Sequence, residues 1–168
     1  MVAVTAGPLW EVVSSVPDPE LPPVTIADLG ILRSIHEVDG DIVVTITPTY
    51  SGCPAVEYIE SQIVVALVEA GWDRDRIRVE RALSPAWSTD WITAAGREKL
   101  ATSGISPPRT SSAGEGSAVG TPVRLGPIVC PLCGSSNTSE VSRFGSTACK
   151  ALFRCDDCAE PFDHVKEI

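Results

Sequence analysis

The chain has 168 residues, a formal net charge of -9, a hydrophobic fraction of 43% and a charged fraction of 21%. These values are typical of a globular protein with one ordinary domain, or one domain and a small appendage. The acidic balance excludes a nucleic-acid backbone as the main partner, because such partners are bound by clustered positive charge. No apolar run reaches the roughly 18 residues of a membrane span, and the N-terminus does not resemble a secretory signal. We therefore expect a cytoplasmic protein without a membrane partner.

The first half of the chain alternates helix and strand signals. A short helix is predicted over residues 8–16, before the proline-rich stretch "PDPELPP". Alternating apolar residues predict strands over 31–38 and 42–47, and the Asp-Gly of "VDGD" between them predicts a tight hairpin.

A helix is expected next, because apolar residues recur at three- and four-residue steps from Val56 to Ala70, and Gly71 ends it. A third strand is predicted over 77–83. A last helix is predicted from Ser88, its N-cap, to Ser103. The order α-β-β-α-β-α predicts a small α+β domain with a mixed sheet over residues 1–105.

A flexible linker is predicted over residues 106–123, because 12 of the 17 residues from 106 to 122 are Gly, Pro, Ser or Thr. The remaining residues, 124–168, are too few to be stable on an apolar core alone. They contain two Cys-x-x-Cys pairs separated by 21 residues, a spacing typical of four-cysteine zinc sites: Cys130, Cys133, Cys155 and Cys158. We predict a C-terminal β zinc ribbon with a structural zinc, because four thiolates leave no open coordination position.

Alternatives to zinc remain at this point, since the same ligands can hold a rubredoxin-like iron, and two disulfides fit an oxidising compartment. Zinc ribbons can bind nucleic acid, but residues 128–168 carry four Lys or Arg against six Asp or Glu. The ribbon is therefore expected to have a structural or protein-contact role. Cys149, between the pairs, is read either as a small buried residue beside the metal or as an accessory thiol that handles metal.

Cys53 lies far in sequence from the other cysteines, between Gly52 and Pro54. Proline favours the first position of a helix, so Cys53 is predicted to be the N-cap, where a thiol caps poorly. The helix N-terminus would lower the pKa of the Cys53 thiol, and Gly52 would leave room for a ligand. Inert packing is the alternative. The sequence does not place a histidine as a partner base for Cys53. We therefore expect neither a thiol enzyme nor catalytic residues.

Three carboxylates, those of Asp18, Glu20 and Asp28, lie in the proline-rich stretch "PDPELPPVTIADLG". The simpler interpretation is a solvated connector whose prolines hold it extended. The functional interpretation is that these carboxylates form a wall near Cys53. The sequence alone cannot show that the carboxylates and Cys53 lie close together in space.

The motif "DPELPPVTIADLGILR" followed by "TPTYSGCPA" resembles the metal–sulfur cluster assembly family that includes SufT-like proteins. Five further motifs are similar to those of the PaaD (PaaJ) family, the D subunits of the phenylacetyl-CoA epoxidase system: "LSPAWSTDWIT", "GISPP", "FGSTACKAL", "RCDDC" and "EPFD". Two features depart from those relatives. The chain ends in "HVKEI" instead of a Tyr-Phe-Lys-Cys-Ile tail, and its linker lacks extra Cys and His residues.

The resemblance implies a non-catalytic accessory protein that helps mature the iron–sulfur or di-iron centre of the epoxidase. It makes Cys53 the functional thiol, Asp18 and Glu20 the acidic loop, and Asp28, Thr47, Gly52 and Pro54 supporting residues. The implied cofactors are structural zinc and a transient iron–sulfur cluster or iron. The implied partners are the other epoxidase subunits, and a homodimer would form if two chains bridge a cluster. A structural or docking subunit of the same complex is the alternative.

Overall fold

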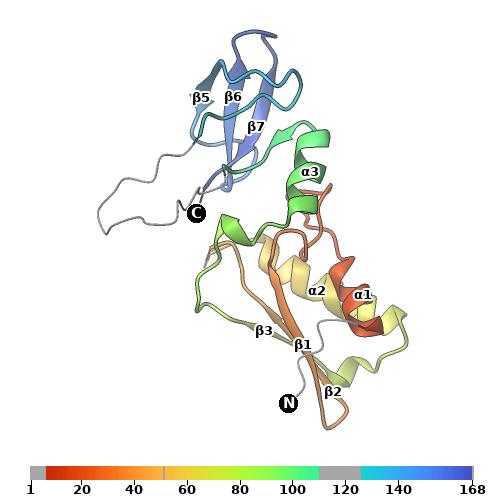
Figure 1. Cartoon of the computed structure of the whole chain (residues 1–168). Coiled ribbons are helices and arrows are strands. Elements are labelled where there is room, and N and C mark those ends of the chain that lie inside the picture. The colour runs from red at the N-terminus through yellow and green to blue at the C-terminus, as the bar shows by residue number, and fades with distance from the viewer. Residues whose placement is uncertain (1–6, 51, 110–125, 168) are drawn as a thin grey trace, which may run out of the picture. The chain divides into compact units, whose positions relative to one another are not determined.

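Figure 1 shows the computed structural model of the chain, which describes residues 7–50, 52–109 and 126–167. The described residues divide into two compact units, the first ending at Gly96 and the second running from Arg97 to Glu167. Within these residues, no helix is long and apolar enough to cross a membrane.

Three strands and four helices or helical turns precede the boundary between the units, and the first six of these elements in the chain follow the predicted order except for the added turn η1. They are α1 (Pro8–Ser14), β1 (Leu32–Val38), β2 (Asp41–Ile46), α2 (Ala55–Glu69), the 3-10 turn η1 (Arg74–Arg76) and β3 (Ile77–Arg81). A second 3-10 turn, η2 (Thr89–Trp91), follows, and helix α3 (Ala94–Thr102) spans the boundary.

The sheet of the first unit has the strand order β1-β2-β3. Strands β1 and β2 are antiparallel, and β2 pairs with β3 in parallel across the helical connection, so the mixed sheet is confirmed. The predicted hairpin is also confirmed, because Asp39 and Gly40 both have positive φ angles, of 53° and 84°.

One face of this sheet carries the core. Ile42, Val44 and Ile46 alternate along β2 and are fully buried. Helices α1 and α2 pack against the sheet, as Figure 1 shows, and α2 buries the stripe that the sequence predicts: Val56, Ile59, Ile63 and Leu67. The helix ends at Glu69, and Gly71, at a φ of 97°, reverses the chain.

The last predicted helix of this unit is wrong in its first part. Ser88 caps only the short turn η2, by accepting a hydrogen bond from the Asp90 N–H at 3.3 Å. The helix α3 starts later because the Thr93 N–H donates to the carbonyl of Asp28 at 2.9 Å, far along the chain. This tertiary hydrogen bond fixes residues 92–93 in an extended connection.

The second unit is built on a four-stranded sheet of order β4-β7-β6-β5. Its strands are β4 (Ile105–Ser106), β5 (Thr138–Ser142), β6 (Lys150–Cys155) and β7 (Pro161–Val165). Strand β4 is parallel to β7, while β5, β6 and β7 are antiparallel neighbours. The predicted β ribbon is therefore present, and β4 is a strand that the sequence does not predict.

The predicted domain limits, 1–105, 106–123 and 124–168, stay a prediction. Most of the predicted linker lies outside the described residues. Its described part, residues 106–109, is held by β7 and by the C-terminal residues, because Ser106 is in β4 and Arg109 forms two hydrogen bonds to the carboxylate of Glu167, at 2.6 and 3.0 Å. The chain thus passes from the first unit to the second within α3.

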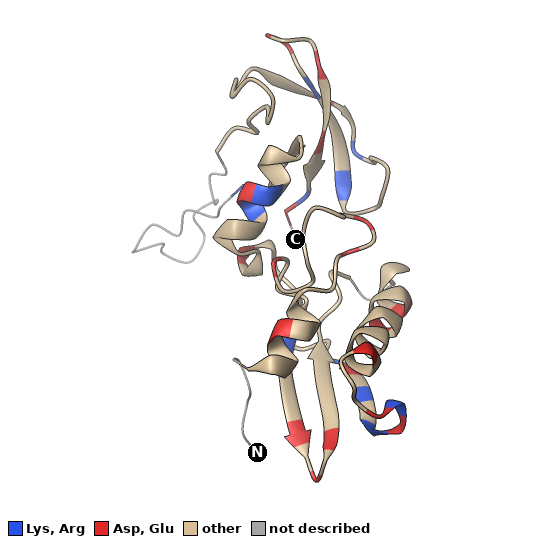
Figure 2. Cartoon of the chain, turned by 90° about the vertical axis from the view of Figure 1, so that its right-hand side faces the viewer, with Lys and Arg blue, Asp and Glu red and all other residues tan. Residues whose placement is uncertain are grey.

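The two units differ in charge. Residues 1–96 carry 14 Asp or Glu against five Lys or Arg, whereas residues 97–168 carry eight of each. The net charge of the chain therefore belongs entirely to the first unit. Figure 2 shows acidic residues at the tip of the β1–β2 hairpin, where they lie near the arginines of η1.

Candidate functional site

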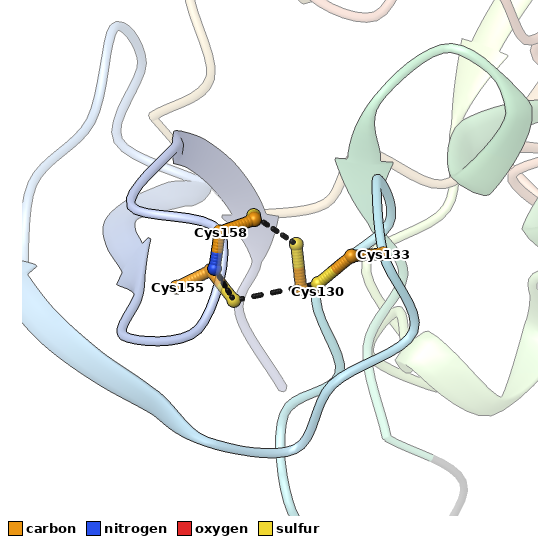
Figure 3. Close-up of side chains that lie close together, drawn as sticks. All are labelled: Cys130, Cys133, Cys155 and Cys158. Carbon is orange, nitrogen blue, oxygen red and sulfur yellow. Dashed lines mark hydrogen bonds between the residues drawn. The ribbon is translucent and has the colours of Figure 1, made fainter.

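The four cysteines predicted as metal ligands come together at one end of the ribbon. Their sulfurs all lie within 4.8 Å of one another, and Figure 3 shows the side chains converging. The Sγ atoms of Cys130 and Cys158 are 3.8 Å apart, and those of Cys133 and Cys155 are 3.5 Å apart. Four sulfurs at about 2.3 Å from one zinc would be about 3.8 Å apart. The donor set therefore fits a tetrahedral zinc.

Two similar turns present these sulfurs. In the first, the Gly134 N–H donates to the Cys130 carbonyl at 2.9 Å, with a φ of 76° at Gly134. In the second, Ala159 has the corresponding positive φ, 65°. The Cys158 N–H points at the Cys155 sulfur at 3.5 Å, and such donors lower the pKa of the Cys155 thiol to about 7. Bound zinc would cross-link the two turns, and its four thiolates would leave no position for substrate.

The turns are joined away from the sulfurs as well. Asp157 accepts hydrogen bonds from Ser135 and from the Asn137 amide, the latter at 2.9 Å. These two donors hold the pKa of the Asp157 carboxyl below its usual value. Behind the turns, Phe153 and Phe162 stack at 6.1 Å between ring centroids and pack with the buried cysteines. The metal end of the ribbon is thus supported on both sides.

Cys53 lies in the loop between β2 and α2, half-buried, one residue further from the helix than the sequence predicts. The first residue before the helix is Pro54, with helical φ and ψ angles of -68° and -20°. The Val56 N–H bonds the carbonyl of Cys53 at 3.3 Å, which closes a tighter turn ahead of the first α-helical one. Cys53 thus lies one residue before the position that the helix bounds give for the N-cap, but its sulfur accepts a hydrogen bond from the Ala55 N–H as an N-cap side chain does.

The pKa of the Cys53 thiol is raised, not lowered as the sequence suggests. Burial is the main cause, because it disfavours the charged thiolate. The Ala55 N–H and the Thr49 hydroxyl act in the opposite direction, by hydrogen bonding to the sulfur. The negative charges of Glu20 and Asp18 raise the pKa further. The thiol is therefore protonated at neutral pH in the absence of a bound cation.

The acidic loop is close enough to Cys53 for the charges of Glu20 and Asp18 to raise the pKa of its thiol. Asp18 is buried, and its Oδ1 accepts hydrogen bonds from the backbone N–H groups of Glu20 and Leu21, at 2.9 and 2.8 Å. It therefore shapes the loop in addition to contributing charge. Glu20 is only half-buried and is the more accessible carboxylate of the two.

Asp28 and Thr47 have local structural contacts. The Asp28 carboxylate accepts a hydrogen bond from the Thr25 N–H at 3.0 Å, and the Asp28 N–H donates to the Thr25 hydroxyl at 3.1 Å. Thr47 is buried at the end of β2, where its N–H donates to the Ile31 carbonyl at 2.8 Å. Their predicted role in supporting the Cys53 site stays a prediction.

Gly52 and Pro54 are exposed on either side of Cys53. A Cβ atom on Gly52 would meet only the Tyr50 ring, at 3.9 Å, which is ordinary contact. No close approach within the described residues requires a glycine here, so Gly52 leaves the surface beside the sulfur open.

Thr49 belongs to the site although the sequence does not single it out. It is the side chain that bonds the Cys53 sulfur, whereas the sequence motif points to Thr47, two residues earlier. Threonine is common at the ends of strands for many reasons, so its presence four residues before a cysteine carries no distinctive signal.

Cys149 does not lie beside the metal. It is buried just before β6, and its sulfur is 3.1 Å from the Thr147 hydroxyl. Six residues along an extended strand separate it from Cys155, a span of roughly 20 Å. The interpretation of Cys149 as a residue packed next to the zinc ligands is therefore wrong, and its role as an accessory thiol stays a prediction.

Comparison with known proteins assigns both units. Residues 117–166 match the PaaD zinc beta ribbon domain, and residues 9–80 match an iron-sulfur cluster assembly protein domain. An Escherichia coli K12 protein, named as the D subunit of a 1,2-phenylacetyl-CoA epoxidase, is 45% identical over 95% of this chain and 92% of its own length. The chain belongs to the PaaD family. The resemblance based on the motifs is thereby confirmed, as is the zinc ribbon.

Other relatives match the assembly domain. An Fe-S protein maturation auxiliary factor of Porphyromonas gingivalis W83 is 30% identical over 45% of this PaaD-family chain and 71% of its own length. A crystal structure of a domain of unknown function, DUF59, from Bacillus anthracis has a TM-score of 0.50 and 27% identity, and covers 55% of this chain and 87% of that one. Cys53 and the acidic loop lie within the matched residues 9–80.

Proposed function

We propose that this chain is an accessory protein that matures an iron centre of a multicomponent phenylacetyl-CoA epoxidase, with Cys53 as the thiol that transiently holds iron or an iron–sulfur cluster. The observation that supports this most is that the charges of Glu20 and Asp18 act on the half-buried thiol of Cys53 and raise its pKa. The names of the relatives, a D subunit of the epoxidase and an Fe-S maturation factor, supply the client and the class of cargo.

The chemistry of the site suits a cation better than an electrophile. Burial and the two carboxylates disfavour a free thiolate, so the sulfur is a weak nucleophile at neutral pH. An iron cation reverses this preference, because its positive charge is attracted by the same carboxylates and its bond to sulfur releases the thiol proton to solvent. The Thr49 hydroxyl and the Ala55 N–H then donate to the metal-bound thiolate.

An independent thiol enzyme fits less well. Activation of a cysteine nucleophile needs a lowered pKa or an adjacent base, and the pKa of Cys53 is raised. We therefore propose no catalytic residues and assign the zinc of the ribbon a structural role. The partners in this proposal are the oxygenase or reductase subunits of the epoxidase, in the cytoplasm. Two chains would have to share a cluster if Cys53 is the sole protein ligand from each.

Cellular maturation tests the proposal. The epoxidase subunits are produced with the wild-type chain, with Cys53→Ser, or with Cys149→Ser as a matched control that also removes one free thiol. We expect Cys53→Ser to lower the iron content and activity of the purified epoxidase several-fold. Cys149→Ser should leave both unchanged, because its thiol is buried against the Thr147 hydroxyl, and a loss in this variant would assign Cys149 the accessory role. Normal iron content with Cys53→Ser would refute the proposal.

A docking subunit is the second candidate, and exposed apolar side chains of the second unit favour it. Val129, Leu132, Val141 and Phe144 are 44%, 57%, 58% and 73% exposed. Such residues are common at protein interfaces. This candidate predicts that the chain co-purifies with the other subunits at fixed stoichiometry, and that Cys53→Ser changes neither their metal content nor their activity.

A further inference from the structure

The second unit contains a hollow of about 480 Å³ that belongs to neither the four-cysteine site nor Cys53. Its floor is the sheet face on which Ala151, Phe153 and Cys155 alternate along β6. Ala151 is four residues from Cys155, which places it roughly 13 Å from the metal end of the strand. The volume lies in the range of small-molecule binding sites.

A small side chain, that of Ala151, lies between larger ones on the floor of the hollow. Ala151 pairs with His164 across β6 and β7, and the Phe153 and His164 rings pack edge to face with centroids 5.5 Å apart. Ala151 is buried and has only a methyl group to fill the space above the sheet. The floor is therefore apolar at Ala151 and Phe153, and charged residues line the rest of the hollow.

One polar atom on this floor has no hydrogen bond among the described residues. His164 is 2% exposed, and its Nδ1 lies 3.2 Å from the Ser106 hydroxyl. Its Nε2 is 3.4 Å from a Glu167 oxygen, without the geometry of a hydrogen bond. Burial lowers the pKa of His164, so the ring is neutral at pH 7.

The rim supplies positive charge. Arg109 is neutralised by two hydrogen bonds to Glu167, and Arg143 is only 3.9 Å from a Glu140 oxygen, on the exposed surface. The Lys166 ammonium donates to the Ala148 carbonyl at 2.7 Å and lies 4.7 Å from the Phe144 ring centroid. None of the described carboxylates forms an ion pair with Lys166.

We propose that this hollow binds a small organic anion whose flat apolar body lies on Ala151 and Phe153 and whose anionic group is held by Lys166. The floor matches a planar hydrocarbon surface, because aromatic rings stack and burial of apolar area is favourable. Lys166 makes the anion preferable to a neutral ligand, because a charge-assisted contact is stronger than a neutral one. This site is independent of the proposed role of Cys53.

The test is a titration of the full zinc-loaded chain, followed by NMR of its backbone amides. Benzoate and phenyl phosphate carry both the flat body and the anion, and they distinguish a carboxylate from a phosphate ligand. Acetate and inorganic phosphate lack the body, and benzyl alcohol lacks the charge. We expect saturable shifts at residues 151–153 and 164–166 with benzoate or phenyl phosphate, with a dissociation constant on the order of 1 mM, and none with the other three.

Two variants and one control decide whether the anion binds in this hollow or is attracted by the positive charge of the protein in general. Lys166→Gln should weaken binding about tenfold by removing the charge-assisted contact, and Ala151→Leu should abolish it by filling the hollow. Lys99→Gln, at an exposed lysine of α3, should have no effect. Arg143→Gln replaces Lys166→Gln as the test of the rim if the latter does not fold, and should weaken binding. Equal shifts with acetate, binding of benzyl alcohol, unchanged affinity in the rim variants or an absence of saturable shifts would overturn the proposal.

Discussion

The surroundings of Cys53 act on its thiolate form in two opposite directions. The Thr49 hydroxyl and the Ala55 N–H donate to its sulfur, while burial and the charges of Glu20 and Asp18 keep its pKa above the usual value. A protonated thiol with donors already in place is poised for a cation that can displace the proton. The same arrangement protects the free protein from oxidation, because the thiolate is the reactive form.

Removing the Glu20 charge should make Cys53 more reactive. Glu20→Gln eliminates one contribution that raises the pKa, so the pKa falls and the thiolate fraction at pH 8 increases. We expect iodoacetamide to alkylate Cys53 severalfold faster in this variant, as followed by peptide mass spectrometry on zinc-loaded protein. Glu69→Gln, at the far end of α2, is the matched control and should leave the rate unchanged. Equal rates in all three proteins would show that Glu20 does not act on the thiol.

The elements of the first unit are held together by contacts between distant segments. Gly30 lies directly against Trp91, and a Cβ atom on Gly30 would be 2.6 Å from the Trp91 Cβ. The Trp87 indole N–H donates to the Leu29 carbonyl at 2.9 Å, and the Arg33 guanidinium lies 3.7 Å from the Trp91 ring centroid. Residues 87–93 therefore fix the end of the acidic loop against the sheet.

A pair of glycine substitutions separates close packing from backbone strain. Gly71 and Gly30 both have positive φ, but nothing lies within 4 Å of a Cβ on Gly71. Gly71→Ala should therefore cost about 1–2 kcal/mol of unfolding free energy, because alanine is strained in the left-handed region. Gly30→Ala adds a collision with backbone and should cost roughly 2 kcal/mol more. Urea denaturation measures both, and equal costs would contradict the packing of Gly30 on Trp91.

Features encoded by local spacing could be predicted from the sequence, and features that depend on distant partners could not. The stripe of α2, the hairpin at Asp39 and Gly40 and the four zinc ligands each follow from residues close together in the chain. The late start of α3 depends on a hydrogen bond to Asp28, and β4 depends on pairing with β7, 58 residues away. The approach of Asp18 and Glu20 to Cys53 is likewise set by the tertiary fold.

At the scale of the whole molecule, the two units have separate means of stability. The first has a sheet core of fully buried aliphatic side chains, including Ile35, Ile42 and Ile63. The second has a small core of two phenylalanines, an alanine and the buried cysteines, which is too little apolar area to stabilise the residues from Arg97 to Glu167 without a metal.

Chelation of the zinc should therefore unfold the second unit and leave the first unit folded. Removal of zinc at neutral pH under reducing conditions should collapse the NMR signals of residues 126–167 into the narrow range of an unfolded chain, while those of residues 7–50 and 52–96 keep their positions. Cys130→Ser should have the same effect without a chelator. Loss of structure in both units on chelation would contradict separate stability.

The central claim is that Cys53, and not the zinc site, carries iron in transit. Anaerobic reconstitution of the wild type, Cys53→Ser and Cys149→Ser with ferrous iron and sulfide tests this most directly, with iron, sulfide and zinc measured in each protein after desalting. We predict about one zinc per chain in all three, and iron retained by the wild type and Cys149→Ser but lost from Cys53→Ser. Equal iron in Cys53→Ser, or iron that only replaces zinc, would contradict the claim.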